Sequence, residues 1–395
     1  MSALSAATRR SIFLLSCATF ASMSVQRLCD AMLPELAREF SVSLAQAASV
    51  VSVFAMVYGV AQLFFGPMGD RLGKFRVVAF ATLACSVGSA LAVFAPSLDW
   101  LVAARVLVAM FAAAIIPLSL AWIGDTVAYE QRQATLARVG LGTTLGITGG
   151  QLVGGLLTDT LGWRWAFVLI TLLFAGVGAL LLADLRHQQR AQVMVAPDGP
   201  RPAFVRQALS IVTGRWSRIV LTVAFIEGAS GFGVIAIWAS HLHQTLGLPL
   251  AAAGSIVALY GLGGVLYMAL ARHLIPRLGE RRLTRWGVSL VGLSALVIAF
   301  APHWAPTLPA SLLAGFGFFM FHNTMQANAT QMAPQARGTA VALFASALFL
   351  GQSVGVQVSA ALAQRLGSAG VVALGGATMT LIGWWFGRAL RNRPA

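Results

Sequence analysis

The feature that most limits how this chain can fold is a succession of apolar segments, each about 20 residues long. A helix of about 20 apolar residues crosses the hydrocarbon core of a bilayer. Twelve such segments can be drawn, at residues 11–34, 45–68, 77–95, 98–123, 138–158, 164–184, 218–243, 250–272, 284–302, 307–330, 338–364 and 369–388. Charged residues make up only 10% of the chain, against about 25% in a soluble domain. The sequence therefore predicts an all-α membrane protein with twelve transmembrane helices, embedded in a lipid bilayer.

The basic residues alternate from one loop to the next. Of the 27 lysines and arginines, twenty-two fall on one predicted side, and only Arg38, Arg164 and Arg365 fall on the other. Loops rich in lysine and arginine stay in the cytoplasm. This pattern predicts that both termini are cytoplasmic in a bacterial-type inner membrane. It also accounts for the net charge of +15 without a nucleic-acid partner.

One long polar segment, residues 185–217, divides the chain and is rich in proline and arginine. Its composition is typical of a cytoplasmic linker. We expect an N-terminal six-helix bundle at residues 1–184 and a C-terminal six-helix bundle at residues 218–395. The halves resemble each other at an offset of about 205 residues. Gly73, Gly146 and Gly150 have counterparts in Gly279, Gly351 and Gly355. Two pseudo-symmetric bundles place a substrate site between them, near the middle of the bilayer.

A compact loop joins the second and third apolar segments. It reads Gly-Pro-Met-Gly-Asp-Arg-Leu-Gly-Lys-Phe-Arg, where the glycines permit a tight reversal and the cations fix its side of the membrane. It resembles the signature loop of the major facilitator superfamily, Gly-x-x-x-Asp-Arg-x-Gly-Lys/Arg-x-Arg. The matching positions are Gly66, Asp70, Arg71, Gly73, Lys74 and Arg76. The resemblance implies a secondary transporter.

The fifth apolar segment resembles the superfamily's antiporter motif, Gly-x-x-x-Gly-Pro-x-x-Gly-Gly. The corresponding positions are Gly146, Gly150, Gln151, Gly154 and Gly155. Gln151 stands where the family has a proline. Glycines four residues apart form a smooth helix face on which another helix packs closely. The motif implies a likeness to the twelve-span, proton-coupled exporters of drugs and metabolites.

Four charged side chains fall inside predicted helices, where each costs about 2.5–3.5 kcal/mol near the bilayer centre. Arg27 and Asp30 are three residues apart and share a helix face. They lie at the same outer depth as Arg105, so we expect one cluster across the first and fourth segments. Glu227 is nearer the middle of its segment, with no basic residue within a helical turn.

Glu227 and Asp30 are the predicted proton-coupling residues. Burial without a paired cation disfavours a charged carboxylate, so Glu227 is expected to take and release the coupling proton. Arg27 is expected to keep Asp30 ionised, so that Asp30 holds a cationic substrate or belongs to a structural ion pair. A structural role for Glu227, bonded to neighbouring polar groups, is the alternative.

The predicted substrate cavity combines polar and aromatic side chains from five segments. Its candidates are Arg27, Tyr58, Gln62, Arg105, Trp122, Trp238, His322, Asn323 and Gln326. His322 and Gln326 are four residues apart on one helix face. A neutral histidine can relay a proton, although an ordinary hydrogen bond between helices would also explain His322. The tryptophans and Tyr58 could equally be packing residues.

The leading hypothesis is therefore a proton-coupled antiporter that exports small organic molecules by alternating access. The alternatives are an importer or facilitator of a sugar or organic anion, with Arg27 and Arg105 holding the anion, and a transport-inactive sensor or scaffold. The sequence has no nucleotide-binding loop, catalytic triad or metal-ligand spacing, so we expect neither an enzyme nor a cofactor. The proton gradient is the expected energy source, and a monomer the expected state.

Overall fold

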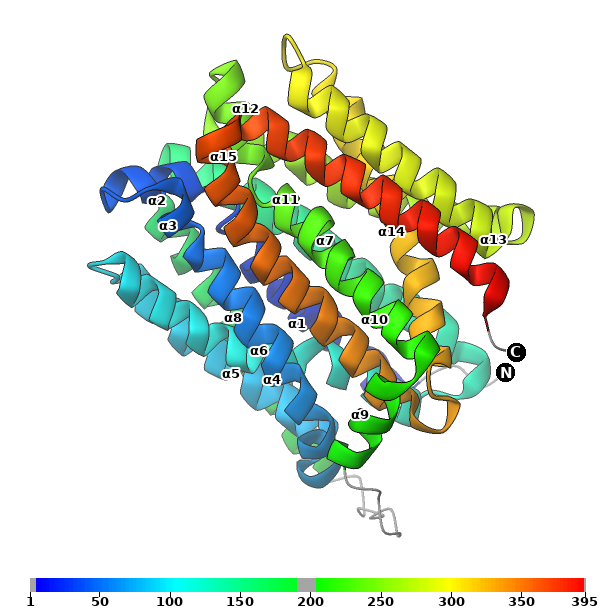
Figure 1. Cartoon of the computed structure of the whole chain (residues 1–395). Helices are drawn as coiled ribbons and strands as arrows, with labels where there is room; N and C mark the ends of the chain where they lie inside the picture. The colour runs from blue at the N-terminus through cyan, green and yellow to red at the C-terminus, as the bar shows by residue number, and fades with distance from the viewer. Residues whose placement is uncertain (1–4, 190–203, 394–395) are drawn as a thin grey trace.

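The computed structural model describes residues 5–189 and 204–393, and this part of the chain is helical throughout, with no strand (Figure 1). The N-terminal half contains α1 (Ala6–Arg27), α2 (Leu33–Glu39), α3 (Leu44–Ala47), α4 (Ser49–Leu72), α5 (Lys74–Val93), α6 (Leu98–Thr126), α7 (Tyr129–Thr160) and α8 (Trp163–Gln189). The C-terminal half contains α9 (Phe204–Thr213), α10 (Arg215–Glu227), a π-helix (Gly228–Phe232), α11 (Gly233–Ile235), α12 (Trp238–Leu246), α13 (Leu250–Phe300), α14 (Thr307–Gln331) and α15 (Arg337–Ala389), with short 3-10 turns at Pro334–Ala336 and Leu390–Asn392.

Two of these helices are each a pair of membrane spans. The 51 residues of α13 are interrupted at Gly279 (φ 66°, ψ 166°), and the 53 residues of α15 at Gly367 (φ 76°, ψ 151°). In the described chain, seven helical segments are long and apolar enough to cross a membrane. They include α13, α15 and the combined segment from α10 to α12. With both pairs separated and the more polar α1, α7 and α14 added, twelve spans result. This confirms the all-α fold of two six-helix bundles.

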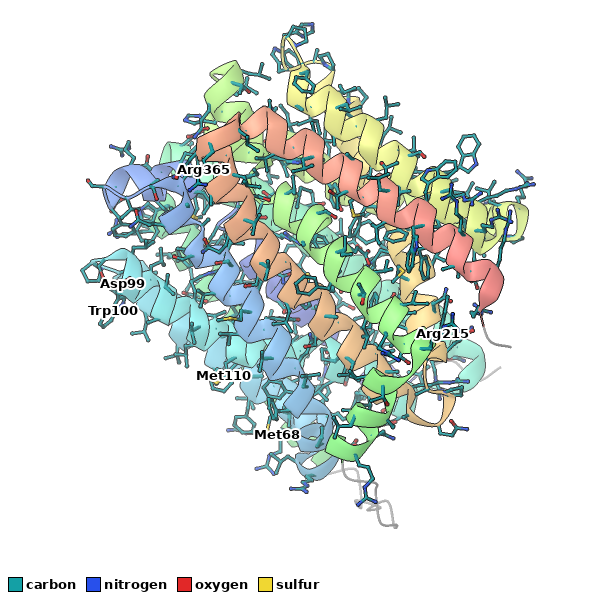
Figure 2. The ribbon with its side chains drawn as sticks, viewed as in Figure 1. Met68, Asp99, Trp100, Met110, Arg215 and Arg365 are labelled. Atoms are coloured by element: carbon teal, nitrogen blue, oxygen red, sulfur yellow. The ribbon has the colours of Figure 1, made fainter. Side chains whose placement is uncertain are left out.

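Loops predicted to share a side of the membrane lie at the same end of the molecule (Figure 2). Figure 2 shows Arg365 and Asp99 at one end of the molecule, and Arg215 and Met68 at the opposite end. We call the end with Arg365 the outer side and the end with Arg215 the inner side, following the arginine distribution.

The first helix is shorter than the sequence predicted. The expected segment was 11–34, but α1 ends at Arg27 and a turn leads into α2. Pro34 is the reason, because proline has no N–H to donate and its ring collides with the preceding helical turn. Asp30 therefore lies in the turn just after α1.

Backbone conformation repeats between the halves. Among the described residues, positive φ angles occur at Ser41, Gly73, Gly162, Gly247, Gly279 and Gly367. They form three pairs, separated by 206, 206 and 205 residues. Each pair occupies the same reversal in its own half, so the internal repeat extends to the turn geometry.

Glycines on α7 let its backbone lie directly against α1. An added Cβ at Gly142, Gly146, Gly150 or Gly154 would collide with the carbonyl oxygen of Ser16, Phe20, Ser24 or Leu28, respectively. The C-terminal half repeats this arrangement between α15 and the α10 region. There, Gly351 faces the carbonyl of Phe225 and Gly355 that of Ala229. The glycines of the antiporter-like motif thus serve helix packing.

We expect Gly150→Ala to lower the stability of the folded protein. The new methyl group would meet the Ser24 carbonyl and the Cβ of Arg27, 3.0 Å away, and overpacking typically costs about 1–3 kcal/mol. Gly140→Ala is the matched control on the same helix, because an added Cβ there has no atom within 4 Å. It should gain up to about 1 kcal/mol of helix propensity. Thermal unfolding in detergent measures both, and equal shifts would contradict the packing argument.

The predicted linker, 185–217, is partly helical. α8 continues to Gln189, α9 occupies residues 204–213, and α10 begins at Arg215. Thr339 on α15 donates a hydrogen bond of 2.6 Å to the Gln207 side chain of α9. Residues 190–203 lie outside the described part, so the division into 1–184, 185–217 and 218–395 stays a prediction.

The two bundles meet along α7 with α13 and along α4 with α15. Near the outer side, Gln357 donates to Ser52 Oγ at 2.7 Å. The backbone N–H of Ala251 donates to Asp159 at 2.5 Å. Gly155 packs against the Leu250 backbone. These contacts join the outer ends of the bundles.

Candidate functional site

A buried carboxylate–imidazole pair lies between α10 and α14. The Glu227 side chain is fully buried, and its Oε1 is 2.8 Å from Nδ1 of His322. Its other oxygen, Oε2, has no hydrogen-bond partner among the described residues. Glu227 is the last residue before the π-helix. The π-helix begins at Gly228, which packs against the backbone of α15. Single-turn π-helices are rare and are frequently found at functional sites.

Aromatic rings surround the imidazole of His322. Phe318 stacks on it with a ring-centroid distance of 5.6 Å and an interplanar angle of 10°. Phe319 and Phe344 lie at 6.3 and 5.8 Å. The His322 side chain keeps 15% of its surface exposed. The imidazole therefore lies among aromatic rings and provides the one side-chain hydrogen bond that the described residues offer to Glu227.

A second buried group lies at the end of α1. Arg27 Nη1 is 3.4 Å from Asp30 Oδ2, and Gln151 Nε2 donates to the same oxygen at 2.8 Å. Gln151 was singled out only as a departure from the family's proline, and its contact with Asp30 was not expected. A glutamine inside an apolar segment was the one sign in the sequence of such a contact, because a buried amide needs a polar partner.

Arg105 does not share this ion pair. Its guanidinium donates to the carbonyl oxygens of Val25 at 2.6 Å and Val50 at 3.2 Å, and it covers the Phe54 ring at 4.1 Å. Arg105 nevertheless lies close enough for its charge to act on Asp30. The expected neighbours thus comprise the Arg27–Asp30 ion pair and an arginine that joins α6 to α1 and α4.

The bundles approach each other at the centre through Arg27. Its guanidinium lies 4.2 Å from the ring centroid of Phe232, in the π-helix of the other half. Tyr260 on α13 is 3% exposed and lies close enough to feel the charges of both Arg27 and Glu227. Its hydroxyl has no hydrogen-bond partner among the described residues, and neither has Nε1 of Trp238. The two ring centroids are 6.2 Å apart.

The remaining cavity candidates are dispersed. Tyr58 packs across the bundle interface on Phe349, with centroids 4.5 Å apart, and Gln62 is buried one turn further along α4. Trp122 packs on Phe75 within the N-terminal bundle, at 5.4 Å. Asn323 hydrogen bonds to Tyr267, and Gln326 is exposed on α14.

The signature loop connects the inner ends of three helices. Gly73 adopts φ 90° and ends α4, a conformation that costs glycine little. Lys74 forms an ion pair with Asp70 at 3.2 Å and a closer one with Asp125 at the end of α6. Arg76 lies 5.9 Å from the Phe80 ring centroid. Arg71 is exposed, and Gly66 has no atom within 4 Å of an added Cβ.

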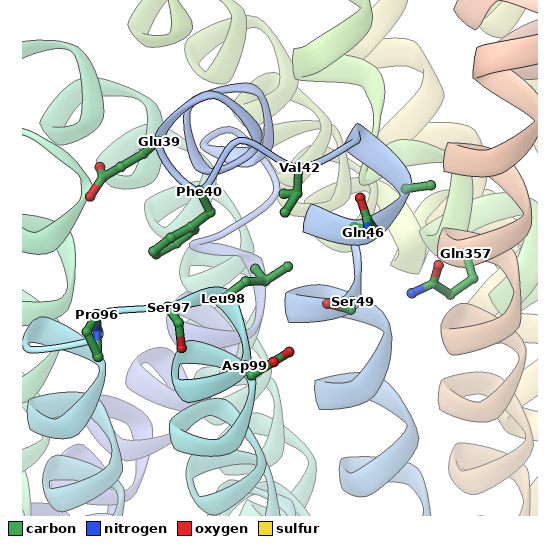
Figure 3. Close-up of a pocket in the computed structure, with 11 residues that line it drawn as sticks. Glu39, Phe40, Val42, Gln46, Ser49, Pro96, Ser97, Leu98, Asp99 and Gln357 are labelled. Atoms are coloured by element: carbon green, nitrogen blue, oxygen red, sulfur yellow. The ribbon is translucent and has the colours of Figure 1, made fainter.

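A pocket of about 840 Å³ opens on the outer side (Figure 3), and neither buried pair belongs to its lining. Its walls come from α2, α3, the start of α6 and Gln357 of α15. At its rim, Glu39 accepts hydrogen bonds from Trp163 Nε1 at 2.5 Å and Arg164 at 2.6 Å. Arg164 also donates to the carbonyl of Ala95 at 3.0 Å. The outer loops of the N-terminal bundle are thus tied together.

We expect this tie to weaken in acid. Burial raises the pKa of the Glu39 carboxyl, but the hydrogen bonds from Arg164 and Trp163 outweigh it, so the pKa lies below its ordinary value. A lowered folded-state pKa gives stability that is complete above the unfolded-state pKa and is lost as the pH falls through the folded-state pKa. Glu39→Gln should therefore lower stability at neutral pH, by up to about 1 kcal/mol, and reduce the loss in acid.

The control for Glu39→Gln is Glu35→Gln, which removes a carboxylate paired with the highly exposed Arg38. Thermal unfolding across an acid-to-neutral pH series compares the two variants. An unchanged acid profile in Glu39→Gln would contradict the assigned role.

Comparison with known sequences identifies the fold family. A sequence model of the Major Facilitator Superfamily matches residues 15–356. The chain belongs to this superfamily. Members of the Major Facilitator Superfamily are secondary transporters, so the chain is a multi-pass membrane transporter, and its family is generally not enzymatic. The resemblance of the signature loop is thereby confirmed.

Its relatives within the superfamily include several bacterial proteins. YgaY of Escherichia coli O157:H7, an uncharacterised transporter, is 26% identical over 388 residues, which is 95% of each chain. Puromycin resistance protein pur8 of Streptomyces alboniger is 30% identical over 205 residues, covering 51% of this chain and 38% of pur8. Riboflavin transporter RibZ of Clostridioides difficile is 23% identical over 163 residues, or 40% of this chain and 36% of RibZ.

The fold is similar to a solved transporter structure. A bacterial homologue of the human lysosomal transporter Spinster, in an inward-facing and unoccupied conformation, superposes with a TM-score of 0.74 over 100% of both chains, at 16% identity. This likeness supports the two-bundle architecture found here.

Proposed function

We propose that this member of the superfamily is a proton-coupled antiporter that exports small organic molecules. The observation that carries the proposal is the Glu227–His322 pair, in which one oxygen of a fully buried carboxylate contacts the imidazole and the other has no hydrogen-bond partner among the described residues. A proton can be held there or lost without breaking a fixed ion pair. Asp30 differs, because Arg27 and Gln151 both bind it, so we assign it to orienting Arg27 beside the substrate.

The proposed cycle follows from the position of the pair at the centre of the C-terminal bundle. In the outward-facing state, a proton from outside binds Glu227, neutralises the pair and favours release of the substrate. The bundles then rock so that the outer ends close, as they are in this structure through Ser52–Gln357 and Asp159–Ala251. Loss of the proton to the inner side restores the charge and the affinity for the next substrate molecule.

The surroundings of the pair favour substrates with a flat aromatic ring. Phe232, Phe318 and Tyr260 lie around the centre, and stacking of aromatic rings adds about 0.5–1.5 kcal/mol per pair. The Tyr260 hydroxyl and the Trp238 indole N–H are donors there, and neither has a hydrogen-bond partner in the part of the chain that the structure describes. Two relatives carry the names of puromycin and riboflavin, and both compounds contain a heteroaromatic ring.

The first experiment is thermal unfolding of the purified protein with puromycin, riboflavin and a sugar as probes, at an acidic and an alkaline pH. A ligand that binds the folded state raises the unfolding temperature. We expect an aromatic probe to stabilise the protein more at the alkaline pH, because the proposed cycle binds substrate after the coupling proton has left. Stabilisation by the sugar alone, or an equal effect at both pH values, would contradict the proposal.

Direction of transport is tested separately in inside-out vesicles. The lumen of these vesicles is made more acidic than the medium, so that protons leave the lumen through the transporter. An antiporter should then carry the stabilising probe in the opposite direction, into the lumen and against its own gradient. Substrate movement in the same direction as protons would instead favour the importer, with Arg27 holding an anionic group. Absence of flux for every binding probe would favour a sensor or scaffold.

The proposed orientation places both ends of the chain in the cytoplasm of a bacterial inner membrane, with the protein as a monomer. The excess of arginines on the inner side supports it. Reporter fusions at residue 395, active only in the cytoplasm or only outside, test the orientation.

A further inference from the structure

Several arginines converge at the inner end of the C-terminal bundle. Figure 1 shows the end of α15 beside the reversal in α13, and these helices pack against each other. Arg281 and Arg285 follow the reversal, and Arg391 follows α15. From residue 218 onwards the sequence contains only two acidic residues, Glu227 and Glu280. The central Glu227 pairs with His322, so Glu280 is the one acidic side chain that the described residues of this half place at this end.

Glu280 is already bound by a different arginine. Arg393 Nη1 lies 3.1 Å from Glu280 Oε2 and also donates to Asn328 Oδ1 at 3.1 Å. The amide of Asn328 donates to Glu280 at 3.3 Å. This network fixes Arg393 against α13 and α14. Among the described residues, Arg281, Arg285 and Arg391 form no ion pair.

Arg285 is held in place beside the last turns of α15. Its guanidinium lies 4.9 Å from the Trp384 ring centroid, and its Cγ lies 3.1 Å from an ideal Cβ position on Gly387. The Nε atoms of Arg285 and Arg281 are buried and have no partner among the described residues. Burial, and then the positive charges of Arg285 and Arg391, lower the pKa of Arg281. Free arginines in water would spread apart, whereas these are held together.

Exposed tryptophans place the arginines at the membrane surface. Trp286, Trp384 and Trp385 are 63%, 40% and 46% exposed, and tryptophan is enriched at the level of lipid headgroups. The positive-inside rule requires basic residues on this side, but it does not require that they converge. Arginine binds phosphate oxygens through paired N–H donors, and basic pockets at the cytoplasmic ends of helices bind anionic headgroups.

We propose that Arg281, Arg285 and Arg391 form a binding site for the phosphate of an anionic phospholipid of the inner leaflet. Trp286, Trp384 and Trp385 then lie at the depth of the glycerol backbone and upper acyl chains. The lipid neutralises the repelling guanidinium groups and joins the ninth and twelfth spans.

Native mass spectrometry of the full-length protein, freed of lipid in a neutral detergent, tests the site with phosphatidylglycerol as the probe. Phosphatidylcholine is the zwitterionic comparison, and inorganic phosphate and glycerol 3-phosphate are the soluble ones. The variant is Arg281→Gln with Arg285→Gln. The matched control, Arg277→Gln with Arg282→Gln, removes the same charge from two exposed arginines around the same reversal.

We expect the wild type and the control to retain phosphatidylglycerol and the Arg281/Arg285 variant to bind it about 30-fold more weakly. Arg281→Lys with Arg285→Lys keeps the charge and should recover part of the binding, which separates charge loss from misfolding. Equal weakening in the control, or no difference from phosphatidylcholine, would overturn the proposal. Binding of inorganic phosphate or glycerol 3-phosphate as tight as that of phosphatidylglycerol would overturn the lipid as the ligand.

Discussion

A Glu227→Gln variant is expected to lose proton-driven transport, down to the level of liposomes without protein, while it still exchanges substrate for substrate. Glutamine has nearly the same shape as a protonated glutamate and can still bond to Nδ1 of His322, but it cannot release a proton. The variant is therefore fixed in the neutral state of the cycle. Reconstituted protein is assayed for pH-driven flux and for counterflow of the probe identified by thermal unfolding.

Glu280→Gln is the control for this variant, because Glu280 is the other acidic residue of the C-terminal bundle and lies at its inner end. It should retain the dependence of flux on the pH gradient. A Glu227→Gln protein that still accumulates substrate against its gradient, driven by protons, would refute the proposed role of Glu227.

The partner of Glu227 shows what the sequence alone could and could not provide. Glu227 was found because a carboxylate inside an apolar segment is costly, and His322 because it lies in a polar stretch of the tenth span. Nothing in the sequence pairs them, since 95 residues separate the two. Only the packing of α14 against α10 brings the imidazole to 2.8 Å from the carboxylate.

The twelve spans were predictable because a single physical rule, the length of an apolar segment, decides them. The internal repeat was predictable from glycines, since positive φ angles and close helix contacts both favour a residue without a side chain. The turn at Asp30 was missed, because the apolar pattern continues through it and only Pro34 marks the break. The contact of Gln151 with Asp30 could not be predicted, because it depends on how α7 is rotated against α1.

Removing one member of the Arg27–Asp30 pair is expected to destabilise the protein by about 3–5 kcal/mol, whereas removing both should cost much less. Asp30→Asn leaves the Arg27 guanidinium buried without an anion, 1% exposed and stacked on Phe232. Arg27→Gln removes the ion-pair partner of Asp30 and leaves the Gln151 amide as its hydrogen-bond donor among the described side chains. The double variant buries two neutral groups that can hydrogen bond to each other. Thermal unfolding in detergent of the two single variants and the double variant gives the coupling between the residues.

The double variant also separates the two roles that this ion pair can have. If Arg27 orients the substrate, the double variant should fold stably but should bind the aromatic probe weakly at both pH values. If the pair only holds the end of α1 against α7, the double variant should transport at the rate of the wild type. Single variants as stable as the wild type would contradict the ion pair itself, because an unpaired buried charge cannot be tolerated at no cost.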